Sequence, residues 1–169
     1  MSEADAADEL APLIGAAEHA GSLLRERHLT LATAESCTGG LIGHLLTESP
    51  GSSDYYQGGL ISYSDTLKQH ELGVDAATLE HHGAVSAQTC IAMAEGARRR
   101  YGCDIAIAVT GIAGPTGDTP GKPLGLTYVA VADADGHEVR RHQWFGDRHR
   151  NKVASAAAAL TLLVERLEQ

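Results

Sequence analysis

Helical periodicity marks both ends of the chain, where apolar residues recur at intervals of three and four positions. The first helix follows an acidic start, residues 1–9, which we expect to be frayed, and it ends near His28. The second helix begins at Gly146-Asp147-Arg148 and continues to the C-terminus. The apolar positions are Leu10, Leu13, Ile14, Ala17, Ala20 and Leu24 in the first helix, and Val153, Ala156, Ala157, Leu160, Leu163 and Leu167 in the second.

Shorter apolar and β-branched runs predict the strands. The run from Asp104 to Val109 is typical of a strand buried on both faces. The last two runs are joined across Asp133-Ala134-Asp135-Gly136 and predict a β-hairpin. The predicted strands cover residues 29–33, 55–63, 104–109, 126–131 and 138–145.

Helices are predicted between these strands. Asp65 is expected to cap a short helix that carries Lys68, and Ser86 opens a longer helix that ends before Gly102. Two further helices cover residues 41–46 and 76–81. Strands that alternate with helices, followed by a hairpin, predict an α/β fold. We expect a single domain over residues 1–169, built as a three-layer α/β/α sandwich with a mixed β-sheet.

The stretch Thr33-Ala34-Glu35-Ser36-Cys37-Thr38-Gly39-Gly40 lies where a predicted strand passes into a helix. A hydroxyl or thiol on such a turn is held rigidly beside unpaired N–H groups of the helix start. Glycines there allow a ligand to approach the backbone. Ser36 and Cys37 are therefore adjacent candidates for a nucleophile. The alternative is a glycine-containing turn that has no chemistry.

A serine nucleophile needs a base, and Tyr63 and Lys68 stand close together in the next strand-to-helix segment. Lys68 would act as the base if burial lowered its pKa, and Tyr63 would orient the hydroxyl or relay a proton. The competing interpretation of Lys68 is a solvated helix lysine. Cys37 ranks below Ser36 because no histidine partner is evident, and the role of Glu35 is left open.

A second candidate site is the glycine-rich loop that begins at Thr110-Gly111 and continues to Gly114. It leaves a buried strand, where the ligand crevice of an α/β sheet commonly lies, but it matches neither a P-loop nor a dinucleotide fingerprint. Arg148, at the start of the last helix, is a candidate clamp for a phosphate or carboxylate. Its alternative is a surface arginine.

Charge and composition restrict the class of partner. The net charge of −9 argues against general affinity for nucleic acid or an anionic membrane, although a local basic pocket is compatible with it. The N-terminus lacks the features of a secretion signal, and the longest apolar run, residues 154–164, is too short to span a bilayer, so a cytoplasmic location is expected. Three cysteines without CxxC spacing and nine histidines without ligand spacing predict neither disulfides nor a metal site. The alanine-rich helices fit a homo-oligomer or a monomer equally well.

Seven motifs in order resemble the C-terminal domain of the CinA (competence/damage-inducible) family, the PncC-type nicotinamide-nucleotide amidases. They extend over nearly the whole chain after Leu10, and the chain resembles the stand-alone form without a molybdopterin-binding-like N-terminal domain. The motifs are Thr33-Ala-Glu-Ser-Cys-Thr-Gly-Gly40, Gly51-Ser-Ser53, Tyr63-Ser64 with Lys68, His82-Gly-Ala-Val-Ser86, Val109-Thr-Gly-Ile-Ala-Gly-Pro115, Lys122-Pro123-Leu-Gly125 and Gly146-Asp-Arg148.

This resemblance implies an amidohydrolase that converts nicotinamide mononucleotide to nicotinate mononucleotide and ammonia, in pyridine nucleotide recycling. Ser36 would be the nucleophile, Lys68 its base and Tyr63 a supporting group. The small-molecule substrate would be the only partner required, and no metal or organic cofactor would be needed. The remaining residues of the implied substrate-binding site are Thr38, Gly39 and Gly40, whose backbone N–H groups would stabilise an oxyanion, together with Ser53, Thr110, Gly111 and Arg148.

Two other functions stay open at this point. One is a non-catalytic nucleotide-binding or regulatory module linked to competence or the DNA-damage response. The other is an amidase that acts on a different small amide. The combination of Ser36, Tyr63 and Lys68 favours an enzyme, because a binding pocket alone does not require that trio.

Overall fold

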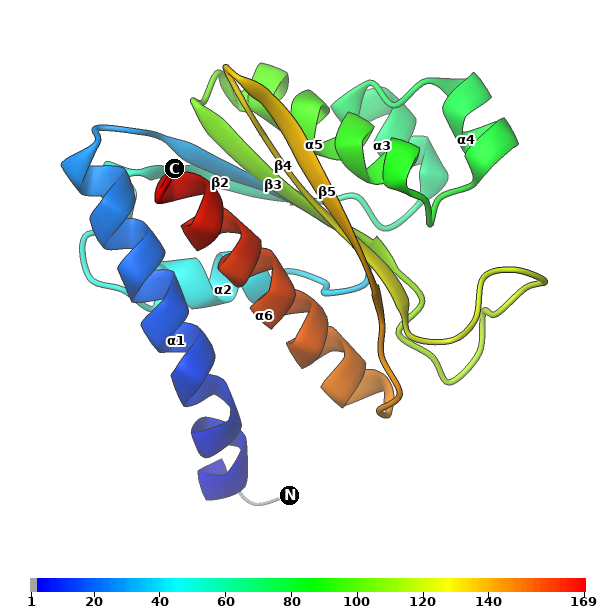
Figure 1. The fold of residues 1–169 in the computed structure, drawn as a ribbon, viewed down its shortest axis with the longest axis horizontal. Helices are drawn as coiled ribbons and strands as arrows, with labels where there is room; N and C mark the ends of the chain where they lie inside the picture. The colour runs from blue at the N-terminus through cyan, green and yellow to red at the C-terminus, as the bar shows by residue number, and fades with distance from the viewer. Residues whose placement is uncertain (1–2) are drawn as a thin grey trace.

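The computed structural model describes residues 3–169, with side chains from Leu10 onward (Figure 1). Helix α1 begins at Glu3, earlier than expected, and of the predicted frayed start Met1 and Ser2 lie outside the described residues. In chain order the elements are α1 (Glu3–Glu26), β1 (Leu31–Glu35), α2 (Leu41–Thr47), the 3-10 helix η1 (Ser52–Asp54), β2 (Tyr56–Ile61), α3 (Asp65–Leu72), α4 (Ala76–His82), α5 (Ala87–Tyr101), β3 (Ile105–Gly111), β4 (Leu126–Asp133), β5 (Gly136–Gln143) and α6 (Arg148–Leu167).

The strands form one mixed sheet in the order β2-β1-β3-β4-β5. β1 pairs in parallel with both β2 and β3, whereas β4 is antiparallel to both β3 and β5. The predicted mixed sheet and hairpin are therefore confirmed. Because β2 and β3 lie on opposite sides of β1, the winding of the chain reverses between β1 and β3. The carboxyl ends of these two strands form a topological switch point, where ligand sites of α/β sheets occur.

Helices α1, α2 and α6 cover one face of the sheet, and α3, α4 and α5 cover the other (Figure 1). The strands specify these faces by alternating large and small residues. In β3, Ile105, Ile107 and Val109 contact the first layer, while Ala106 and Ala108 contact the second. Small alanine side chains allow α5 to lie close to the sheet. The three-layer α/β/α arrangement is thus confirmed.

Two local boundaries near the carboxyl edge differ from the prediction. β1 covers Leu31–Glu35 rather than residues 29–33, so Glu35 belongs to the strand. Ser64 rather than Asp65 caps α3, because its hydroxyl oxygen accepts the N–H of Leu67 at 3.2 Å. None of the helices within residues 3–169 combines the length and apolar character needed to cross a membrane.

Candidate active site

A pocket with a volume of about 240 Å³ opens at the carboxyl ends of β1 and β3. Ser36 follows β1 directly, and Thr110 and Gly111 end β3. The structure therefore brings the two candidate sites of the sequence together at the switch point. The pocket is lined by Ser36, Cys37, Tyr63, Lys68, Ala84, Val85, Thr110, Gly111, Ile112, Ala113, Gly114, Thr116, Gly117 and Arg148.

Buried Glu35 fixes the turn that carries Ser36. Its carboxylate accepts hydrogen bonds from the Thr38 hydroxyl at 2.6 Å and from the backbone N–H groups of Gly40 and Gly43 at 3.0 and 2.8 Å. N–H groups at the start of a helix otherwise lack acceptors, and a carboxylate there also complements the helix dipole. Glu35, whose role the sequence left open, therefore caps α2 and holds the turn in shape.

These hydrogen bonds change the expected position of the oxyanion donors. The N–H of Gly39 donates to Ser36 O at 3.1 Å, and the N–H of Gly40 is taken by the capping carboxylate. Neither glycine lines the pocket, and their N–H groups already have acceptors within the turn, so their role as donors to a ligand stays a prediction. Cys37 lines the pocket, and within residues 10–169 its N–H group donates to no other residue. This N–H group is the donor on the turn that is available to an oxyanion.

Lys68 is buried, with 1 % of its side chain exposed, and its amine reaches Ser36. Nζ lies 3.4 Å from Ser36 Oγ, 2.8 Å from Ser62 O and 3.4 Å from Tyr63 O. Burial lowers the pKa of the Lys68 amine, and the carboxylate of Asp65, 3.9 Å away, opposes that shift. The solvated helix lysine that competed with the base interpretation is therefore excluded.

The neighbours of Lys68 orient its neutral amine. A neutral amine has two N–H donors and one lone pair, and the carbonyl groups of Ser62 and Tyr63 offer two acceptors. When these carbonyls take the two donors, the lone pair faces Ser36 Oγ. The arrangement can accept the proton of the serine hydroxyl without a histidine.

Cys37 is buried beside Ser36, in an environment that disfavours its thiolate. Burial raises the pKa of Cys37 to about 12, and the charge of Glu35 adds to the shift. Lys152 and Lys68 oppose it without cancelling it. A thiol with this pKa stays protonated at neutral pH and is a poor nucleophile. The geometry therefore favours Ser36 over Cys37.

Tyr63 and Arg148 form the outer rim of the pocket. Arg148 donates from Nη1 to Gly114 O at 2.8 Å and from Nη2 to the phenol oxygen of Tyr63 at 3.2 Å. Both acceptors are neutral, and the guanidinium forms no ion pair with a carboxylate of the described residues. Tyr63 is 60 % exposed, and its phenol oxygen accepts from Arg148. Its expected support of the nucleophile stays a prediction.

The end of β3 forms the floor of the pocket. Thr110 Oγ1 donates to Ala84 O at 2.8 Å, which ties the strand to the loop between α4 and α5. Gly111 has no room for a side chain, because an added β-carbon would lie 2.8 Å from Leu126 O and 3.1 Å from Cys37 Sγ. At this strand end, Thr110 thus shapes the pocket through its hydroxyl and Gly111 through its lack of a side chain.

Asn151 is a site-supporting residue that the sequence reasoning missed. Its Nδ2 donates to Ala113 O, and its Oδ1 accepts the N–H of Gly146, both at 3.0 Å. The side chain is buried and joins the pocket loop to the turn before α6. The sequence carries one indication of this role. Asn151 is an amide residue that closely follows the Gly146-Asp147-Arg148 motif, in a helix with an apolar stripe.

Ser53 lies apart from this pocket. It is exposed in η1, which precedes β2. Because β2 runs parallel to β1, η1 lies near the amino end of the strands, opposite the pocket. Within the chain, Ser53 therefore does not join the residues around Ser36.

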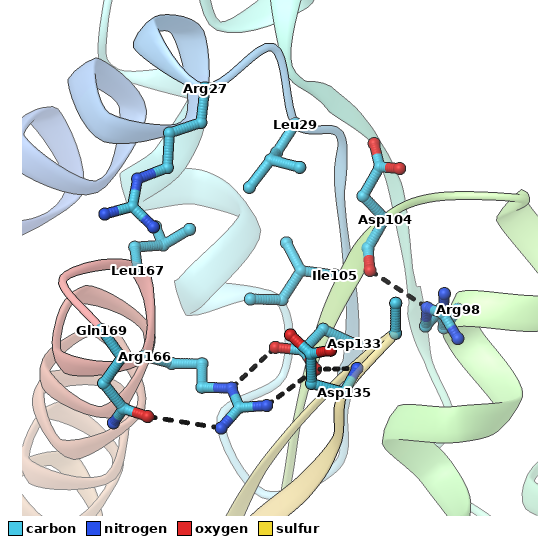
Figure 2. Close-up of a pocket in the computed structure, with 11 residues that line it drawn as sticks. Arg27, Leu29, Arg98, Asp104, Ile105, Asp133, Asp135, Arg166, Leu167 and Gln169 are labelled. Atoms are coloured by element: carbon cyan, nitrogen blue, oxygen red, sulfur yellow. Dashed lines mark hydrogen bonds and ion pairs between the residues drawn. The ribbon is translucent and has the colours of Figure 1, made fainter.

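A larger cavity, of about 360 Å³, lies at that amino-terminal end of β1 and β3 (Figure 2). Arg27, Arg98 and Arg166 lie around it at the ends of α1, α5 and α6, where cations complement the helix dipole. Arg166 also forms an ion pair with Asp133 at 2.6 Å. The lining contains no serine, cysteine, lysine or histidine, so the candidate nucleophiles and the candidate base all lie in the pocket at Ser36. In the part of the chain that the structure describes, no cluster of three or more His, Cys, Asp or Glu side chains is suited to a metal ion.

Comparison with known proteins identifies relatives of the whole fold. The sequence profile of the CinA C-terminal domain matches residues 14–167. A CinA-like protein from Salinibacter ruber is 51 % identical over 140 residues, which cover 83 % of this chain and 34 % of the relative. A putative competence-damage inducible protein from Moorella thermoacetica is 49 % identical over 143 residues, which cover 85 % of this chain and 34 % of the relative. The chain spans about one third of the length of these curated relatives.

Solved structures agree with this comparison. A competence-damaged protein (CinA) superfamily protein from Klebsiella pneumoniae superposes with a TM-score of 0.89 at 33 % identity, over 92 % of this chain and 98 % of that one. A competence/damage inducible protein from Agrobacterium tumefaciens gives a TM-score of 0.87 at 39 % identity, over 93 % of this chain and 96 % of that one. From the profile match over residues 14–167 and the shared fold, this chain belongs to the CinA C-terminal domain family.

Proposed function

We propose that this chain hydrolyses the carboxamide of nicotinamide mononucleotide to nicotinate mononucleotide and ammonia. The single observation that carries the proposal is the position of the buried Lys68 amine, 3.4 Å from Ser36 Oγ. The backbone carbonyls of Ser62 and Tyr63 accept the N–H groups of this amine. A buried lysine beside a serine hydroxyl has no evident structural use, because burial of a cation is unfavourable and its one carboxylate neighbour, Asp65, is exposed and 3.9 Å away. The substrate itself is taken from the resemblance of the motifs to the nicotinamide-nucleotide amidases.

In the proposed reaction, the neutral Lys68 amine takes the Ser36 proton while Oγ forms a bond to the carboxamide carbon. The oxyanion accepts the N–H group of Cys37. The Lys68 ammonium then returns the proton to the amide nitrogen, the C–N bond breaks and ammonia leaves. Water, deprotonated by Lys68, attacks the acyl carbon, and the proton returns to Ser36 as the ester bond breaks.

The charge of the pocket supports an anionic substrate. The chain has a net charge of −9, yet the pocket lining contains Lys68 and Arg148 and no carboxylate. A nucleotide phosphate is complementary to such a lining, whereas a neutral amide such as free nicotinamide gains nothing from Arg148. This contrast favours the mononucleotide over the different small amide considered from the sequence.

The test is ammonia release from the wild-type protein, Ser36→Ala and the matched neighbour Cys37→Ala. Each receives nicotinamide mononucleotide, free nicotinamide or glutamine. We expect release from the mononucleotide by the wild type and Cys37→Ala, and loss in Ser36→Ala. Full activity in Ser36→Ala would refute the serine mechanism. Binding of the mononucleotide without release would instead favour the non-catalytic nucleotide-binding module.

A further inference from the structure

Lys152 lies beside the turn that carries Ser36, on the first turns of α6. A β-carbon added at Gly39 would lie 3.6 Å from Lys152 Nζ, so the amine lies against the bare backbone of that glycine. Lys152 is also four positions after Arg148, which places the two cations on the same side of the helix. The sequence reasoning did not single out this residue.

The Lys152 ammonium has no anionic partner among residues 10–169, whose side chains the structure describes. No carboxylate of that range forms an ion pair with it, and no acceptor there forms a hydrogen bond with it. The side chain is half-buried, in a chain that carries 22 acidic residues. Its charge nevertheless acts on the site, because Lys152 is among the groups that favour the thiolate of Cys37. An unpaired cation at this place is available to a ligand anion.

We propose that the Lys152 ammonium binds the anionic group of the substrate beyond the rim of the pocket, and so selects a phosphorylated amide over its phosphate-free counterpart. This inference rests on the proposed function and deepens it by assigning a specificity-determining residue. With the carboxamide at Ser36, the rest of the substrate extends outward past the rim. Arg148 holds one side of that rim through Gly114 and Tyr63. Lys152 lies just outside the pocket lining, against Gly39 of the turn that carries Ser36.

The bare backbone at Gly39 is part of the same arrangement. Gly39 is exposed and has a φ of 65°, a conformation that residues with side chains rarely adopt. The glycine therefore places no side chain against the ammonium.

The test compares Lys152→Gln, the charge-conserving Lys152→Arg and the matched control Arg150→Gln. Arg150 is exposed on the same turn of α6 but two positions away, so its side chain points in a different direction. The substrates are nicotinamide mononucleotide and the phosphate-free nicotinamide riboside. We expect Lys152→Gln to raise KM for the mononucleotide about tenfold, with kcat within about twofold and the riboside KM unchanged. Lys152→Arg should retain most of the affinity, and Arg150→Gln should behave as wild type.

Three outcomes would each overturn the assignment of Lys152. They are an equal rise in KM for the riboside, an equal rise in KM in Arg150→Gln, and an unchanged KM for the mononucleotide in Lys152→Gln. Calorimetric binding of the mononucleotide separates this inference from the proposed function. If the wild type binds without hydrolysis, the hydrolytic function fails, and the dissociation constants of the same variants decide the role of Lys152. If the wild type neither binds nor hydrolyses the mononucleotide, both proposals fail.

Discussion

Lys68 Nζ lies 3.4 Å from Ser36 Oγ although the residues are 32 positions apart. The parallel register of β1 and β2 produces this proximity, because Glu35 pairs with Ile61 and the N–H of Ser62 donates to Glu35 O at 2.8 Å. The two strands therefore end side by side. One continues into the turn of Ser36, and the other continues into α3, which turns Lys68 back over that turn.

The pH dependence of hydrolysis tests Lys68 as the base. Burial lowers the pKa of its amine from the ordinary lysine value, and only the neutral amine can take a proton. We expect kcat/KM to rise with pH through a single step whose midpoint lies below that ordinary value. Lys68→Ala should lower kcat by about 100-fold or more. A flat profile across the step, measured by ammonia release, would contradict the role.

Asp65→Asn is the matched variant for this profile. The Asp65 carboxylate, 3.9 Å from Nζ, raises the pKa of Lys68 against the effect of burial. Removing its charge should lower that pKa, so the midpoint of the rising limb should move to lower pH. Movement to higher pH, or no movement, would show that Asp65 does not act on the amine.

Thiol accessibility tests the ranking of Ser36 over Cys37. The cysteines Cys37, Cys90 and Cys103 are all buried, and burial raises the pKa of each. We expect Ellman's reagent to modify none of them in the folded protein at pH 8, and all three after denaturation in guanidinium. Rapid modification of one thiol in the native protein, lost in Cys37→Ala, would return Cys37 as a candidate nucleophile.

The layers of the fold could be predicted from the sequence, because the spacing of apolar residues along a helix or strand shows which of its faces are buried. The alternation of isoleucine and alanine in β3 marks a strand buried on both faces, but both kinds of residue are apolar. The pattern therefore does not tell which helices cover which face. That assignment follows from the order of the strands, which depends on pairings between distant segments.

Sequence motifs single out Ser36, Lys68 and Arg148 as candidates, but they do not reveal the residues that hold these side chains in place. The partners of a buried polar residue are set by the fold: Asn151 donates to Ala113 O, 38 positions away. Similarly, the donors expected at Gly39 and Gly40 were already occupied, which no local pattern reveals.

The stability of Glu35 variants tests its role as the cap of α2. Glu35→Ala leaves the Thr38 hydroxyl and the N–H groups of Gly40, Ile42 and Gly43 without their acceptor. We expect the free energy of unfolding to fall by about 3 kcal/mol in urea denaturation. Thr38→Val, which removes one of these hydrogen bonds, should lower it by about 1 kcal/mol. If the free energy of unfolding fell equally in the two variants, Glu35 would not stabilise the turn by accepting several hydrogen bonds.

Gly111→Ala tests whether the floor of the pocket requires a residue without a side chain. The new β-carbon would meet Thr127 Oγ1 at 2.6 Å and Leu126 O at 2.8 Å, and the second of these is backbone that must move. We expect a loss of about 1–3 kcal/mol in the free energy of unfolding, together with reduced kcat because the strand end shifts beside Cys37. Gly15→Ala is the matched control: nothing lies within 4 Å of its added β-carbon, and the residue is in α1. Since alanine favours a helix over glycine, that variant should gain about 0.5–1 kcal/mol. If Gly111→Ala were less stable but kept the wild-type kcat, the close packing at Gly111 would not be required for the reaction at Ser36.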